Sequence, residues 1–214
     1  MTSKFTPYEW FRTDFDVRTL IDIGANDGAY GAVLATQLNV ERAYFFEPQQ
    51  SCRARIEAAT VGFGHAEIFS FALSDEEGET VFIETSESPS ASLLPLGEVH
   101  REAFPDIVET GRTRVEVRRL DDVLLDREMP GDILIKIDVQ GVEDRVIRGG
   151  TATFSRAAIV LIEVSFQEVY KGQALFEEIH AALTGCGLRL AGLRNQVANL
   201  RPLFAHFIYV RPRT

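Results

Sequence analysis

RTLIDIGANDGAYG, residues 18–31, is the stretch of sequence that decides the fold. Residues 19–23 are apolar and rich in β-branched side chains, which is typical of a buried parallel strand. A turn with Gly24 and Gly28 follows, and residues 30–38 have the pattern of a helix. Glycines permit a tight turn and close approach of the backbone, and a helix N-terminus offers free N–H groups. Strand, glycine turn and helix together indicate a site for a nucleotide-type cofactor.

An acidic residue follows this turn at the distance expected for a ribose-binding group. A second apolar strand is predicted over residues 43–46, and it ends in Glu47. Glu47 stands 23 positions after Gly24. A carboxylate that binds ribose hydroxyls is found about 20 positions past the glycine turn. Glu47 is therefore a candidate for binding a ribose.

The charges around the turn favour one kind of cofactor. The dinucleotide pattern G-x-G-x-x-G is not met, because Asn26 stands where its second glycine belongs. The carboxylates of Asp22, Asp27 and Glu47 would repel a pyrophosphate. S-adenosylmethionine fits better, since it has a cationic centre, an amino group and ribose hydroxyls but no phosphate. The alternative is a plain strand–helix unit whose glycines only turn the chain.

Composition and charge limit the classes of partner. The 214 residues, 45% of them hydrophobic, suffice for a single domain over residues 1–214, with residues 1–17 as a lead-in. A net charge of −10 disfavours nucleic acid and anionic membrane surfaces, and suits a small neutral or cationic substrate. Only two cysteines, Cys52 and Cys186, and no long apolar N-terminal segment lead us to expect a cytoplasmic protein.

Hydrophobic patterns predict a doubly wound α/β sheet with helices between most of the strands. The last two strands are expected to form an antiparallel pair at the sheet edge, where a homodimer would form. The predicted strands lie near residues 19–23, 43–47, 65–71, 132–138, 158–164, 187–193 and 205–210.

Three further segments are predicted from local patterns. Residues 65–72 and 79–84 read as a hairpin. Residues 114–118 alternate like an exposed edge strand. Residues 85–113 lack strong periodicity, and a segment of that length without periodicity is usually functional or disordered. We expect residues 85–113 to cover the substrate site.

Four carboxylates lie in or at the ends of predicted parallel strands. Because the carboxyl ends of parallel strands share one edge of a sheet, we expect most of them to face one crevice. Isolated charges on central strands are costly, which indicates a function or a partner for each. Lys136 is available as a partner for Asp138 or Asp22. The four carboxylates belong to Asp22, Glu47, Asp138 and Glu163.

The histidines have no metal-type spacing, so we assign no metal ligands. His100 lies within residues 85–113 and is a candidate general base if that segment closes over the cleft. His180 and His206 are expected to be surface or packing residues.

Several motifs together resemble the FkbM family of S-adenosylmethionine-dependent methyltransferases. The most specific is IKIDVQGVE, residues 135–143, followed by Gly149 and Gly150. The resemblance implies a single Rossmann-like class I methyltransferase domain with a seven-stranded sheet whose last strand is antiparallel. It also implies O-methylation of a hydroxyl, often on a natural product or a sugar. The other matching motifs are IDIGANDG at 21–28, FEP at 46–48, ALSD at 72–75 and RLDD at 119–122.

The resemblance also implies roles for individual residues. Asp22, Gly24, Asn26 and Gly28 would surround the methionine end of the cofactor, and Glu47 would hold the ribose hydroxyls. Adenine would lie beside residues 71–74, which include Ala72, Leu73 and Ser74. Asp138 and Gln140 would stand at the cleft where the methyl group is transferred.

Methyl transfer to an alcohol would be an in-line displacement that also needs a base. Asp138, Glu163 and His100 are the candidates. A divalent metal that acidifies the hydroxyl is an alternative, because several carboxylates converge. Two other functions stay open: a nicotinamide-dependent oxidoreductase, and a domain that binds S-adenosylmethionine or a protein partner without turnover.

Overall fold

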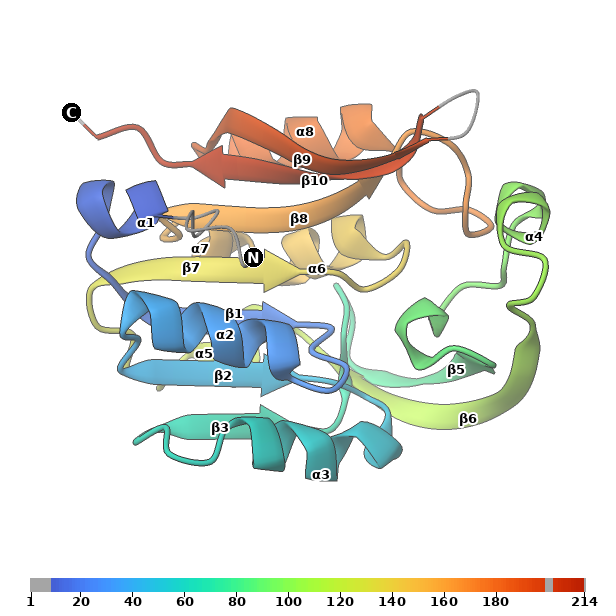
Figure 1. The fold of residues 1–214 in the computed structure, drawn as a ribbon, viewed down its shortest axis with the longest axis horizontal. Coiled ribbons are helices and arrows are strands. Elements are labelled where there is room, and N and C mark those ends of the chain that lie inside the picture. Colours follow the sequence, from blue (N-terminus) through green and yellow to red (C-terminus); the bar gives the residue numbers. More distant parts are fainter. Residues whose placement is uncertain (1–8, 199–201, 214) are drawn as a thin grey trace, which may run out of the picture.

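The computed structural model describes residues 9–198 and 202–213, and its main feature is a seven-stranded sheet (Figure 1). The strand order is β3-β2-β1-β7-β8-β10-β9. The first five pair in parallel, whereas β10 pairs antiparallel with both β8 and β9. This is the doubly wound, mostly parallel sheet that the sequence predicts. Its strands are β1 (Val17–Ile23), β2 (Arg42–Phe46), β3 (Ala66–Phe69), β7 (Asp132–Ile137), β8 (Ile159–Ser165), β9 (Arg189–Ala198) and β10 (Pro202–Val210).

Helices cover both faces of this sheet (Figure 1). Burial on both faces explains why the central strands are continuous apolar runs rather than alternating ones. None of the helices in the described ranges is long and apolar enough to cross a membrane. One face carries α1 (Glu9–Asp14), α2 (Ala29–Leu38) and α3 (Gln50–Ala59), and the other carries α5 (Leu120–Leu124), α6 (Glu143–Gly149), α7 (Thr151–Phe154) and α8 (Phe176–Gly185).

A second sheet has the order β4-β6-β5 and consists of β4 (Ala72–Leu73), β5 (Gly78–Thr85) and β6 (Glu109–Arg118). The predicted hairpin is wrong, because β3 pairs with β2 and β5 pairs with β6. The predicted edge strand is also wrong, since β6 lies in the middle of the small sheet. Alternation of apolar and polar residues along a strand indicates only which face is exposed. It does not indicate which strands pair, because the paired residues are distant in the sequence.

The segment of residues 85–113 is ordered, although its sequence has no periodicity. It contains the 3₁₀ turn η1 (Ser88–Ser90), the helix α4 (Glu98–Ala103) and the first half of β6. Contacts with distant residues hold it, as where the Ser92 hydroxyl donates to the Gln140 carbonyl at 2.6 Å. Elements this short do not produce a readable hydrophobic period.

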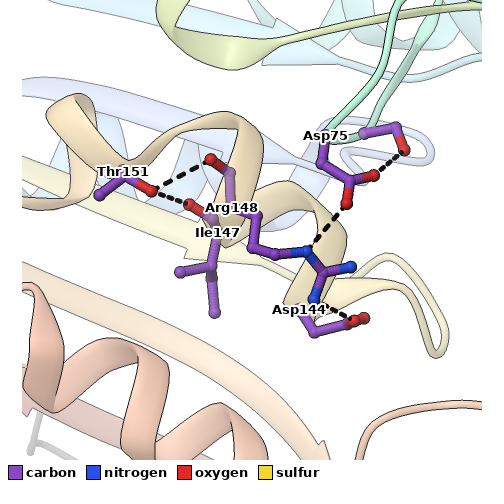
Figure 2. A network of polar contacts seen from close by, with 6 residues as sticks. Asp75, Asp144, Ile147, Arg148 and Thr151 are labelled. Atoms are coloured by element: carbon purple, nitrogen blue, oxygen red, sulfur yellow. Dashed lines mark hydrogen bonds and ion pairs between the residues drawn. The ribbon is translucent and has the colours of Figure 1, made fainter.

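The end of α6 is joined to the loop after β4 (Figure 2). Arg148 donates to Asp75 at 2.8 Å and to Asp144 at 2.7 Å. These groups are half-exposed, so each pair adds little to stability. The closest approach is made by backbone: a Cβ built on Gly149 would lie 2.0 Å from the carbonyl oxygen of Ser74. A glycine is therefore needed where α6 meets this loop.

Replacement of Gly149 should therefore separate the two sheets at their junction. Gly149→Ala is expected to destabilise the protein by about 2–3 kcal/mol, because the obstructing atom is backbone and cannot rotate away. The measurement is the urea midpoint of unfolding. Gly185→Ala is the matched control, since Gly185 also ends a helix but its Cβ would meet nothing within 4 Å. Equal midpoints for the two variants would contradict this account of the junction.

Candidate active site

The loop between β1 and α2 has backbone conformations that explain its residues. Gly24, Asn26 and Gly28 have φ angles of 73°, 48° and 75°. Asparagine tolerates the left-handed region better than most residues, so Asn26 fits a position where glycine is the other choice. A Cβ on Gly24 would lie 1.9 Å from the carbonyl oxygen of Asp138. Glycine at position 24 thus lets the loops after β1 and β7 touch.

A buried ion pair supports this loop from below. The ammonium of Lys136 lies 3.1 Å from the carboxylate of Asp22 and donates to the Gly24 carbonyl at 2.6 Å. Asp22 is 1% exposed. Burial raises the pKa of Asp22, and the charge of Lys136 opposes that shift. Asp22 therefore acts through Lys136 on the shape of the loop, and it is absent from the linings of the two cavities at the ends of the strands.

Glu47 fixes the other side of the loop. Its carboxylate accepts the backbone N–H of Asn26 at 2.8 Å and that of Gln49 at 2.9 Å. Burial raises the pKa of Glu47, and these two hydrogen bonds oppose the shift. Oε1 also accepts the side-chain amide of Gln49 at 3.2 Å, whereas Oε2 keeps a second lone pair with which Glu47 is able to accept a hydrogen bond from a ligand.

A cavity of about 410 Å³ opens at the carboxyl ends of β1, β2 and β7. Glu47 lies at the end of β2, while Ala72 and Leu73 of β4 add an apolar wall that also includes Phe71. Lys136 and Arg194 are the cations in the described part of this lining. The sequence-predicted residues that line it are Gly24, Asn26, Glu47, Ala72, Leu73, Asp138, Gln140 and Glu163.

A second cavity of about 260 Å³ lies behind Asp138, Gln140 and Glu163, which line both cavities. Aromatic side chains form much of its wall. The remaining lining includes His100, Phe104, Tyr170, Phe204, Val169 and Glu143. The two cavities therefore meet at one group of polar side chains.

Gln140 stands at this meeting point in a strained backbone conformation, with φ 58°. Its amide nitrogen donates to Asp138 through a short hydrogen bond and to Glu163 at 3.4 Å. Its amide oxygen accepts the hydroxyl of Tyr170 at 2.6 Å. Left-handed non-glycine residues that the surroundings enforce in this way are concentrated at functional sites.

Negative charge is crowded at the same point. Glu143 accepts the N–H groups of Val139 at 3.1 Å and Gly141 at 3.0 Å, which fixes the turn after β7. Burial raises the pKa of Glu143 to about 7. Burial and then the charges of Asp138 and Glu143 raise the pKa of Glu163 to about 9. Ionisation of one carboxyl therefore disfavours that of the next.

Two histidines reach the site. His100 is 3% exposed, lines the second cavity, and its Nδ1 has no hydrogen-bond partner within the described ranges. Burial, with a smaller effect of Arg101, lowers the pKa of His100. His206 lines the first cavity, with its Nε2 3.5 Å from the carboxylate of Glu163. Its side chain is 42% exposed, and its place beside Glu163 could not be predicted, because the order in which β10 inserts beside β8 cannot be read from local sequence.

The segment of residues 85–113 contributes to both cavities. The Ser88 hydroxyl donates to the Asn26 side chain at 3.0 Å, and Gln49 donates to the Ser88 carbonyl at 3.2 Å. Pro89 lines both cavities, so η1 forms part of the wall where the two cavities meet.

Two other predicted site residues lie outside both linings. Gly28 is the N-cap of α2, and a Cβ there would lie 3.1 Å from Ile56. The Ser74 hydroxyl donates to Asp75 at 3.1 Å. The structure thus gives Gly28 and Ser74 contacts within the scaffold.

The strand order, the glycine loop after β1 and the acidic end of β2 define a class I methyltransferase fold. Two solved structures share it. One is magnesium protoporphyrin IX methyltransferase from Synechocystis PCC 6803 with bound SAM (11% identity, 95% of this chain, 75% of that chain, TM-score 0.50). The other is an rRNA methylase from Streptococcus thermophilus (10% identity, 100% and 99%, TM-score 0.51).

The chain belongs to the FkbM methyltransferase family, because the family model described as "Methyltransferase FkbM domain" matches residues 22–190. This confirms the resemblance drawn from the motifs. The 2-O-methyltransferase NoeI of Sinorhizobium fredii is 30% identical over 160 residues, which are 72% of this chain and 66% of NoeI. The AMB antimetabolite synthetase AmbE of Pseudomonas aeruginosa is 27% identical over 176 residues, 68% of this chain but only 8% of AmbE.

The buried ion pair under the loop has a measurable consequence. Asp22→Asn should destabilise the protein by about 3 kcal/mol or more, because it leaves the ammonium of Lys136 without its charged partner. Chemical denaturation measures the loss. Asp126→Asn, at an exposed position, is the control and should be neutral. An unchanged free energy of unfolding for Asp22→Asn would mean that the buried ammonium of Lys136 does not need this carboxylate as its partner.

Proposed function

We propose that the chain is an S-adenosylmethionine-dependent O-methyltransferase whose acceptor is a hydroxyl group of a small molecule, such as a sugar or a natural product. The observation that carries the proposal is the meeting of two cavities at Asp138, Gln140 and Glu163. An in-line displacement needs a cofactor and an acceptor that approach one point from opposite sides. The name of the relative NoeI, a 2-O-methyltransferase, supports a hydroxyl as the acceptor.

S-adenosylmethionine would occupy the larger cavity. The methionine end would lie against the loop of residues 24–28, and Glu47 would accept hydrogen bonds from the ribose hydroxyls. The apolar wall with Ala72 and Leu73 would flank adenine. The sulfonium methyl group would then point toward Asp138 and Gln140. The carboxylates of this site suit a cationic sulfonium and an ammonium group.

The acceptor would occupy the smaller cavity, with its hydroxyl at the junction beside Asp138 and Glu163. The neutral imidazole of His100 would accept the hydroxyl proton as the acceptor oxygen attacks, and the resulting imidazolium would return that proton to water. When bound, S-adenosylmethionine would supply the methyl group to form the methyl ether and would leave as S-adenosylhomocysteine, with the electron pair of the broken carbon–sulfur bond on sulfur. His100 suits the role of base because burial keeps it neutral near pH 7 and its Nδ1 is unpartnered among the described residues.

The direct test is incubation of the chain with S-adenosylmethionine and a panel of hydroxylated sugars and natural products, with release of S-adenosylhomocysteine as the readout. Acceptor-dependent release above the acceptor-free rate, with a methyl ether as product, is the expected result. Binding of S-adenosylmethionine without transfer to any acceptor would favour a non-catalytic binding domain. Binding of NAD(H) instead would favour an oxidoreductase.

His100 can be tested separately by its pH profile. With an acceptor that turns over, His100→Gln should lower kcat about 100-fold and leave the affinity for S-adenosylmethionine unchanged. The wild-type rate should rise with pH through a pKa lower than that of a free imidazole, since the base works only when deprotonated. The variant should lack this acidic limb. His65→Gln, at an exposed position remote from the cavities, is the control. An unchanged limb in His100→Gln would remove His100 as the base.

A further inference from the structure

Three side chains at the junction of the cavities come from three neighbouring strands. Glu163 of β8 pairs directly with His206 of β10. Asp138 follows Ile137, the last residue of β7, which pairs with Ile162 of β8. Residues opposite each other in a sheet point to the same face. Asp138, Glu163 and His206 therefore form one cross-strand row.

The row offers two carboxylate oxygens and one imidazole nitrogen that all lie within 4.8 Å of one another. From this arrangement we infer a binding site for one divalent first-row transition ion, such as Mn²⁺ or Zn²⁺. Carboxylate oxygens and imidazole nitrogens are the protein ligands of such ions. Three protein ligands would leave coordination positions open to water or substrate oxygen.

The charge of the surroundings independently favours a bound cation. The described lining of the two cavities carries five carboxylates but only two cations, Lys136 and Arg194. Lys136 is engaged by Asp22 and the Gly24 carbonyl. S-adenosylmethionine would add only one net positive charge. A divalent ion would offset part of the remaining excess of carboxylates. The five carboxylates are those of Asp27, Glu47, Asp138, Glu143 and Glu163.

A separate feature points to a ligand beside this row. Only 3% of the surface of His100 is exposed, and its Nδ1 lacks a hydrogen-bond partner in the described part of the chain. It lines the same 260 Å³ cavity as Asp138 and Glu163. A hydroxyl held at an open coordination position there would face a proton acceptor. The bound ion would stabilise the deprotonated form of that hydroxyl. This role in methyl transfer rests on the proposed function, whereas the binding of the ion does not.

The site is tested by binding of Mn²⁺ to the metal-free full chain, followed by calorimetry and by the loss of the free-ion electron paramagnetic resonance signal. One saturable site per chain is expected. His206→Ala should weaken binding at least tenfold, and Asp138→Asn should do the same. His65→Ala is the control and should bind like the wild type, since His65 lies outside the row. Circular dichroism establishes that each variant is folded.

The absence of a saturable Mn²⁺ or Zn²⁺ site in the millimolar range would overturn the inference. Equal affinities for the wild type and both row variants would overturn it as well. The proposed function is judged by a different readout. Methyl transfer that survives removal of all metal would refute the ion's role and leave the methyltransferase standing. A saturable Mn²⁺ site in a protein that methylates no hydroxyl would support the ion site and refute the proposed function.

Discussion

The ammonium of Lys136, which extends from β7 toward Asp22 of β1, makes the interaction on which the site depends. It neutralises Asp22 and holds the Gly24 carbonyl at 2.6 Å, so one side chain joins two strands to the loop between β1 and α2. That loop holds Asn26 at a positive φ angle, a conformation that costs energy and persists only where neighbouring groups enforce it. Glu47 completes the support by accepting the N–H of Asn26. The loop is thereby shaped before any ligand arrives, which lowers the entropic cost of binding.

The geometry of a parallel sheet explains where the polar groups collect. Strand carboxyl ends meet at one edge, and the reversal of strand order between the neighbours β1 and β7 opens a crevice there. Asp138, Gln140 and Glu163 occupy the point where this crevice meets the smaller cavity. Repulsion between the carboxylates of Asp138 and Glu163 is costly at a buried site unless a cationic partner offsets it. A cationic cofactor, and the inferred ion, would supply that partner. Binding of either cation would therefore also reduce the repulsion between the carboxylates.

Sequence reasoning predicted the main sheet and much of the first cavity because both depend on local signals. The run at 19–23, the glycine turn and Glu47 each carry their meaning within a short window. The small sheet and the position of His206 were not predictable in this way. They depend on which strands become neighbours, and β10 inserts beside β8 rather than at the edge. Asp22 shows a different limit: the sequence predicts its place at the strand end, but only the three-dimensional fold shows that it supports the loop through Lys136.

Calorimetric titration with S-adenosylmethionine, and separately with NADH, tests the central claim that the loop and Glu47 form a site for S-adenosylmethionine. The account predicts one S-adenosylmethionine per chain, no NADH binding, and an affinity at least about tenfold lower in Glu47→Ala, since hydrogen bonds to a buried carboxylate are lost. Glu57→Ala, on the exposed side of α3, is the control and should bind normally. NADH binding in place of S-adenosylmethionine, or an unchanged affinity in Glu47→Ala, would contradict the account.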